Sequence, residues 1–151
     1  MSSFSHVIDL DADPSSIVSV TDSVVSKWQF VRHRRIGSFA WDPQKVRLHY
    51  CSGQNSSNMI SGFDLWKELV YEHVLNANVL DYLFENQVLI SEEWKRYYEV
   101  YFWGTMYQDD RSPPSLGVRC LVWHHDKWES WIRRLQYRRW RVHMPAAILD
   151  F

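Results

Sequence analysis

The spacing of the apolar residues changes near residue 96, and this change limits the possible folds more than any other feature. Before it, apolar residues recur every three or four positions, as in amphipathic helices; after it they alternate with a period of two, as in strands. Three alternating segments are expected to form strands: 98–107, 118–124 and about 128–142. A polar hairpin loop over 108–114 and a tight connection over 125–127 predict that they form an antiparallel meander.

Helical patterns come before the meander. Ser61 is a typical cap for a helix over 62–73, and Asn76 or Asn78 is a typical cap for a second helix over 77–87. Ser91-Glu92-Glu93 then begins a short helical turn that ends near Lys95, with acidic residues where the helix dipole favours them. We therefore expect two helices and a turn between residues 61 and 96.

The segment 14–32 allows two interpretations. Asp13-Pro14 is a typical helix start, since Asp caps helices and Pro fits their first position. Five apolar residues then follow at helical spacing: Ile17, Val20, Val24, Trp28 and Val31. This spacing favours a helix, but the segment is also rich in β-branched residues, so a strand is the alternative. A half-buried strand is expected over 45–51, where apolar and polar residues alternate.

Together these elements predict a single α+β domain over residues 1–151, with residues 1–13 as a loose N-terminal segment. Helices are expected to pack on one face of an antiparallel sheet that includes the C-terminal three-stranded meander. The chain carries 17 Lys and Arg against 18 Asp and Glu, which gives a net charge of −1. This balance argues against a polybasic protein and against an acidic disordered tail.

The sequence lacks the signals of secretion, membrane insertion and metal binding. No apolar run approaches the roughly 18 residues that predict a membrane span, and the first 30 residues do not resemble a signal peptide. Cys51 and Cys120 are too few for a disulfide framework, so we expect reduced thiols in a cytoplasmic protein. No metal-ligand pattern surrounds them and no glycine-rich phosphate loop is present, so we expect neither metal nor cofactor.

Tryptophan and arginine are concentrated in the last third of the chain. Four of the nine tryptophans lie within residues 123–140, and residues 111–151 hold eight basic residues against three acidic ones. One face of an antiparallel sheet can stay exposed, so these side chains can form an aromatic and cationic surface; alternatively, the tryptophans pack the core. The candidate binding residues are Trp103, Trp123, Trp131, Arg133, Arg134, Arg138, Arg139 and Trp140.

Three functions follow from these residues. The leading hypothesis is a non-enzymatic binding or assembly module whose Trp/Arg surface contacts a protein partner or copies of itself. The second is a single-stranded nucleic-acid binder, in which arginines contact phosphates and tryptophans stack on bases. The third is a small hydrolase that uses His124 or His125, beside Asp126, for acid–base chemistry.

Four short segments also resemble a pattern found in small tryptophan-rich bacterial proteins that have no assigned activity. The segments are Asn76–Leu83, Glu92–Lys95, Phe102–Tyr107 and Pro145–Ala147, and the likeness covers about residues 41–149. The resemblance implies a bacterial, cytoplasmic protein and assigns no catalytic residue. The pattern is richer in Trp and Tyr in its last strand, where this chain has arginines such as Arg133 and Arg138.

Overall fold

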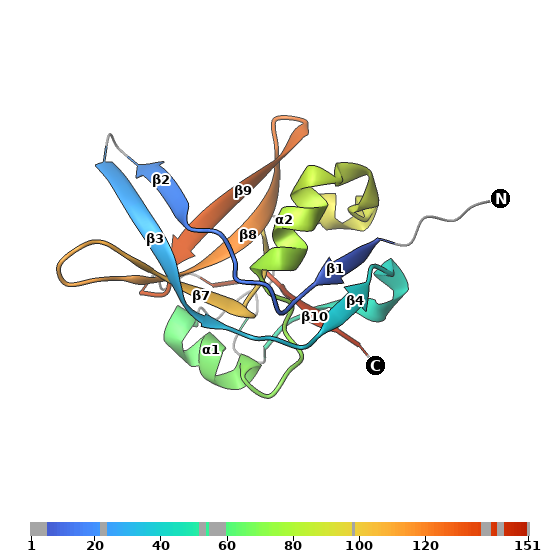
Figure 1. Cartoon of the computed structure of the whole chain (residues 1–151), viewed down its shortest axis with the longest axis horizontal. Helices are drawn as coiled ribbons and strands as arrows, with labels where there is room; N and C mark the ends of the chain where they lie inside the picture. Colours follow the sequence, from blue (N-terminus) through green and yellow to red (C-terminus); the bar gives the residue numbers. More distant parts are fainter. Residues whose placement is uncertain are drawn as a thin grey trace.

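The fold is built around a large mixed sheet and a small two-stranded sheet (Figure 1). The computed structural model describes residues 6–21, 24–51, 54, 60–97, 99–136, 140–141 and 144–150. The strands and helices are β1 (Val7–Asp9), β2 (Ile17–Thr21), β3 (Val24–His33), β4 (Ser38–Ala40), η1 (Pro43–Lys45), β5 (Val46–His49), α1 (Gly62–Leu69), α2 (Ala77–Glu85), η2 (Gln87–Leu89), η3 (Glu92–Arg96), β6 (Val100–Tyr101), β7 (Thr105–Asp109), β8 (Leu116–His124), β9 (Lys127–Arg134) and β10 (Ala146–Leu149).

The large sheet has the strand order β2-β3-β7-β8-β6-β10-β5, and β9 pairs with β8 on its other side. Its pairs are antiparallel except that between β10 and β6, which is parallel. The small sheet pairs β1 with β4. The expected combination of helices with a largely antiparallel sheet is confirmed in this coarser form, but the fold is richer in strands than expected.

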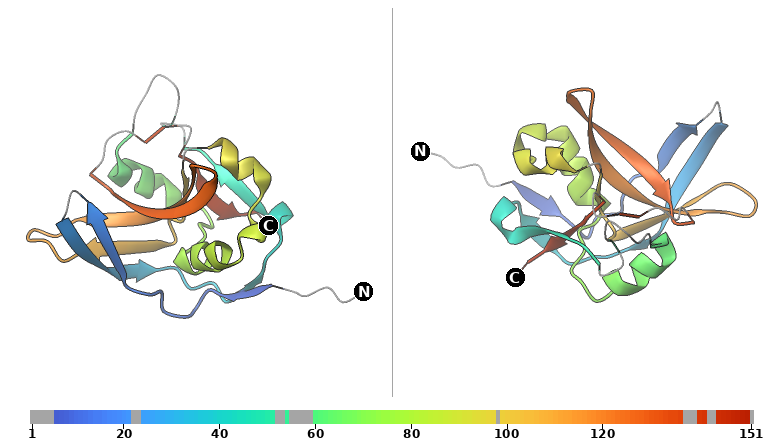
Figure 2. Two further views of the ribbon diagram at one scale, coloured as in Figure 1. Left: turned by 90° about the horizontal axis from the view of Figure 1, so that it is seen from above. Right: turned by 180° about the vertical axis from the view of Figure 1, so that it is seen from behind.

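The two helices cover opposite faces of the sheet (Figures 1 and 2). Leu65 and Leu69 of α1 belong to the core cluster on one side, whereas Leu80 and Leu83 of α2 belong to the cluster on the other. The expectation that the helices share one face is therefore wrong. Because both faces are covered, β8 is buried along most of its length, including both of its alternating sets of side chains.

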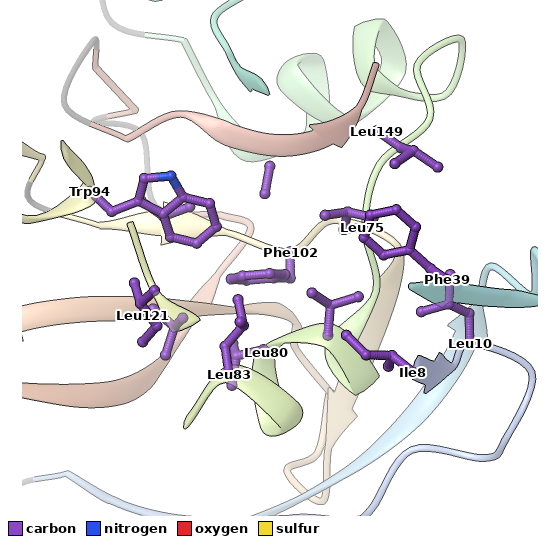
Figure 3. Close-up of a cluster of buried hydrophobic side chains, with 14 of the residues drawn as sticks. Ile8, Leu10, Phe39, Leu75, Leu80, Leu83, Trp94, Phe102, Leu121 and Leu149 are labelled. Carbon is purple, nitrogen blue, oxygen red and sulfur yellow. The ribbon is translucent and has the colours of Figure 1, made fainter. Parts of the chain in front are cut away.

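The cluster on the α2 side joins residues from both ends of the chain. Figure 3 shows Phe102 in its centre, with Leu80 and Leu83 of α2 on one side and Trp94 on the other. Ile8, which lies in β1, is buried in the same cluster. The prediction of a loose segment over 1–13 is therefore wrong for residues 6–13, because burial of Ile8 and pairing of β1 with β4 anchor them.

The prediction of a helix over 14–32 is wrong, and the strand alternative is confirmed. Residues of this segment form the hairpin of β2 and β3, in which Ile17 lies opposite Trp28. The buried side chains of β3 alternate, with Ser26 and Trp28 inside and Lys27 outside, which is the period of a strand. The β-branched residues therefore decide the conformation of this segment, since tertiary pairing outweighs the apolar spacing.

The expected meander is correct in its centre and wrong at both ends. The hairpins β7–β8 and β8–β9 form as predicted. The first expected strand is divided into β6 and β7 by a turn at Trp103-Gly104. The third ends at Arg134, and the separate strand β10 was not predicted. A Cβ on Gly104 would lie 2.8 Å from the backbone of Asn76, so glycine allows this turn to pack against the start of α2.

The predicted helix starts are confirmed. The Ser61 hydroxyl accepts a hydrogen bond from the backbone N–H of Asp64 at the start of α1. The Asn76 side chain accepts one from the N–H of Asn78 at the start of α2. The helix α1 ends at Leu69, four residues before the expected end, and η3 forms where the short turn was predicted.

Candidate functional site

Two of the expected surface tryptophans lie in the interior. Trp103 and Trp140 are both buried, with their ring centroids 5.2 Å apart. The ring of Trp140 also lies 4.5 Å from that of Tyr101, and its backbone forms a bridge with Ile60, next to α1. The expectation that these two indoles belong to an exposed surface is therefore wrong, because they pack the core on the α1 side of the sheet.

The two described arginines of the expected surface are held by buried carboxylates. Arg133 donates to Glu99 at 2.5 Å, and Arg134 donates to Asp109 at 3.2 Å. Each guanidinium therefore compensates a carboxylate in the protein itself, which leaves less charge for a ligand. The other two candidate arginines lie outside the described residues: Arg138 and Arg139.

The remaining two tryptophans lie on opposite faces of the β8–β9 hairpin. Trp131 is 41% exposed and stands opposite Cys120, whereas Trp123 stands opposite Trp128. Positions 120 and 123 are three residues apart in one strand, so their side chains point to opposite faces. Trp123 is partly covered by Lys95, whose Nζ lies 4.0 Å from the ring centroid. The predicted residues therefore do not form one continuous surface.

The histidines of the hydrolase hypothesis lie at an exposed hairpin tip. The Nδ1 atom of His124 lies 2.8 Å from a carboxylate oxygen of Glu129, on the adjacent strand. His125 and Asp126 form the tight turn with positive φ angles of 51° and 60°. An open turn does not exclude water or surround a substrate, so the geometry gives this hypothesis no support.

A cleft of about 500 Å³ between α1 and the end of β3 brings together a different set of residues. It is lined by Arg32, His33, Arg34, Trp66, Leu69, Val70, Val74, Trp103 and Gly104. The volume is in the range typical of small-molecule sites, and the walls combine apolar side chains with a few polar groups. Of the candidate residues from the sequence, only Trp103 contributes to this cleft.

Backbone contacts position the basic wall of the cleft. The pairing of β3 with β7 shifts by one residue between Phe30 and Arg32, and such bulges change the direction of the side chains that follow. The backbone N–H of Arg34 donates to the carbonyl oxygen of Gly104 at 2.7 Å. The Arg34 side chain donates to the carbonyl oxygens of Val70, at 2.9 Å, and Glu72, and so links β3 to the end of α1.

The lining of the cleft is cationic. It contains two arginines and no acidic side chain. The guanidinium carbon of Arg32 lies 4.8 Å from the centroid of the Trp66 ring, and no described carboxylate forms an ion pair with Arg32. Burial, together with the charge of Arg35, lowers the pKa of His33, so its ring is neutral near pH 7. The arginines therefore supply the charge of the site.

One residue of the cleft wall, Trp103, carries a buried polar atom. The indole Nε1 of Trp103 is buried and has no hydrogen-bond partner among the described residues. An unpaired buried N–H costs about 1–3 kcal/mol, so buried N–H groups in native proteins usually have a protein or water acceptor. Because this Nε1 atom has almost no accessible surface, Trp103 contributes its ring to the wall of the cleft, and the exposed guanidinium of Arg32 supplies the hydrogen-bond donors.

Other kinds of site receive no support from the described residues. No group of three or more His, Cys, Asp or Glu side chains among them is placed to hold a metal ion. Cys51 and Cys120 are buried free thiols. Neither helix in the described part of the chain is long and apolar enough to cross a membrane.

No protein-family model matches this chain, and neither the curated proteins nor the solved structures contain a match. The site therefore rests on its own geometry. The sequence did contain a signal for it, the basic run Arg32–Arg35. The missing information was the contact of this run with Trp66, which lies in α1 more than thirty residues further along the chain.

Proposed function

We propose that this protein is a non-catalytic binding module that takes a mononucleotide-sized ligand, a phosphate group attached to a planar ring, into the α1–β3 cleft. The observation that carries the proposal is the lining itself, in which Arg32 and Arg34 occur with aromatic and apolar side chains and without an acidic residue. An anionic ligand gains from this charge, and a planar ring gains from contact with the Trp66 side of the cleft.

Arg32 is the principal contact in this proposal. Its guanidinium stacks near the Trp66 ring, which restricts its orientation while its N–H groups stay available to oxygen atoms. Arg34 contributes charge, since its side chain already donates to backbone carbonyls. The Trp103 ring adds apolar surface to the wall of the cleft. No bond is made or broken in this function.

The test is calorimetric titration with adenosine 5′-monophosphate, with adenosine and inorganic phosphate as separate arms. We expect the nucleotide to bind more tightly than either part alone, and binding to weaken with salt. Removing one charge-assisted contact costs on the order of 1.5–3 kcal/mol, so Arg32→Gln is expected to weaken binding about 10- to 150-fold.

Arg47→Gln is the matched control. Arg47 lies on β5, is exposed, and pairs with Asp150 at 3.5 Å, so its loss removes the same charge away from the cleft. We expect it to leave affinity nearly unchanged. Equal affinity of Arg32→Gln and the original protein would refute the proposal. Binding of a single-stranded oligonucleotide without binding of the mononucleotide would replace it with the nucleic-acid hypothesis.

A further inference from the structure

The edge strand β2 lacks the features that protect most sheet edges. Among the described residues β2 pairs only with β3, so its other side presents unpaired backbone groups. Natural edge strands avoid association through charged residues, proline or bulges, and Ile17–Thr21 contains no charge and no proline. The β2–β3 hairpin extends away from the helices in Figure 1, and its Val18 and Val25 are 62% and 57% exposed.

Other edges of the sheet are protected by charge. The β9 strand, which pairs only with β8 among the described residues, carries Lys127, Glu129 and Arg133. The β5 strand, at the far end of the strand order, carries Arg47. These strands would bring charged side chains into any pairing with themselves, whereas β2 would not. The difference identifies β2 as the edge that is suited to pairing.

The sequence of β2 is nearly symmetric about Ser19. It reads Ile-Val-Ser-Val-Thr, so a two-fold axis through Ser19 would place Ile17 opposite Thr21 of the second copy, and Val18 opposite Val20. Every pair other than that of the two serines then joins two β-branched residues, which are favoured in neighbouring strands. A two-fold dimer requires a surface that complements itself, and this register satisfies the requirement.

We propose that two copies of this chain associate through antiparallel pairing of their β2 strands, centred on Ser19, to form one continuous sheet. A second copy fits this edge because the register introduces no like-charge contact and covers the exposed valine of each strand. The proposal is independent of the nucleotide site. No described residue of β2 lines the cleft, and Ile17, the interface residue nearest to the cleft, lies opposite Trp28, which is four residues or roughly 13 Å from Arg32 along β3.

The first test is the mass in solution as a function of protein concentration. We expect the mass to rise from 18.2 kDa towards twice that value. Val18→Lys is expected to remain at the monomer mass, since it brings two lysines near each other across the interface. Val7→Lys is the matched control, because Val7 is a 56% exposed valine on β1 in the other sheet, and it should associate as the original protein does.

The second test fixes the register. A Val18→Cys variant, treated with a short bis-maleimide, should yield a cross-linked dimer, because Val18 is 62% exposed and the register places the two substituted residues as diagonal neighbours, roughly 7–8 Å apart. The native Cys51 and Cys120 are buried and should not react. A Val7→Cys variant should yield no cross-linked dimer. A monomer mass at every concentration, association of Val18→Lys equal to the original, or dimers without the cross-link would each overturn the proposal.

Discussion

Glu99→Gln should lower the free energy of unfolding more than the replacement of any exposed acidic residue does. The carboxylate of Glu99 is 7% exposed and accepts hydrogen bonds from the Arg133 guanidinium and the Tyr101 hydroxyl, each at 2.5 Å. The Nε of Arg133 donates to the same hydroxyl at 2.6 Å. Burial and the nearby Cys120 and Glu99 raise the pKa of Tyr101, so its hydroxyl keeps the proton that it donates.

The expected cost follows from the burial of the two charges. Breaking a buried ion pair by removing one partner typically costs about 3–5 kcal/mol, because the other charge is left without compensation. The Arg133 side chain remains 22% exposed and water can solvate part of it, so we expect about 2–4 kcal/mol for Glu99→Gln. For a domain of this length that loss lowers Tm by about 5–15 °C.

Urea unfolding and calorimetry measure this loss. Glu92→Gln is the matched control, since Glu92 pairs with Lys95 at 2.9 Å but its side chain is 83% exposed, and exposed pairs contribute less than about 1 kcal/mol. Tyr101→Phe should cost less than Glu99→Gln, because the ion pair with Arg133 remains. A loss for Glu99→Gln no larger than that of the control would refute the argument that this cluster stabilises the fold.

Three further outcomes are expected. Trp140→Ala should cost about 3–5 kcal/mol in urea unfolding because the ring is buried, whereas Trp131→Ala should cost much less because its ring is partly exposed; equal costs would contradict the assigned burial. Burial acts to raise the pKa of Asp109, but hydrogen bonds from backbone N–H groups and a guanidinium lower it below its ordinary value. The contribution of Asp109 to stability is therefore complete above pH about 4 and is lost as pH falls through the native pKa. Asp109→Asn should therefore make the free energy of unfolding depend less on pH in the acid range. The same pH dependence in the variant and the original protein would contradict this prediction. Burial raises the pKa of Cys51 to about 12 and that of Cys120 even further, so a thiol reagent at pH 8 should modify them only after unfolding, and rapid modification of the native protein would contradict their burial.

The sequence predicted correctly those caps and turns that depend on interactions between nearby residues. The cap at Asn76 depends on a hydrogen bond to Asn78, two residues away, and the turn after β8 depends on two adjacent residues. The hairpin loop over 108–114 likewise contains its own turn residues. Such features were predicted because the interactions that form them lie within a few positions of one another.

The rest depends on contacts between distant residues. The β10 strand contains Ala146 and Ala147, which carry no strong strand signal, and it forms because β5 and β6 pair with it. The prediction of the binding surface was wrong for a similar reason. Whether Trp103 is interior or exposed depends on the position of α1, and whether Arg133 is available depends on Glu99. Neither answer is contained in the spacing of residues along the chain.

The position of β10 has a consequence for synthesis of the protein on the ribosome. This strand fills the gap between β6 and β5, yet it is translated almost a hundred residues after β5. At a translation rate of 5–20 residues per second, β10 is synthesised about 5–20 s after β5. Throughout that interval the growing polypeptide exposes apolar strands that its finished form conceals, and a chaperone that holds them apart from other nascent chains would then improve the yield of folded protein.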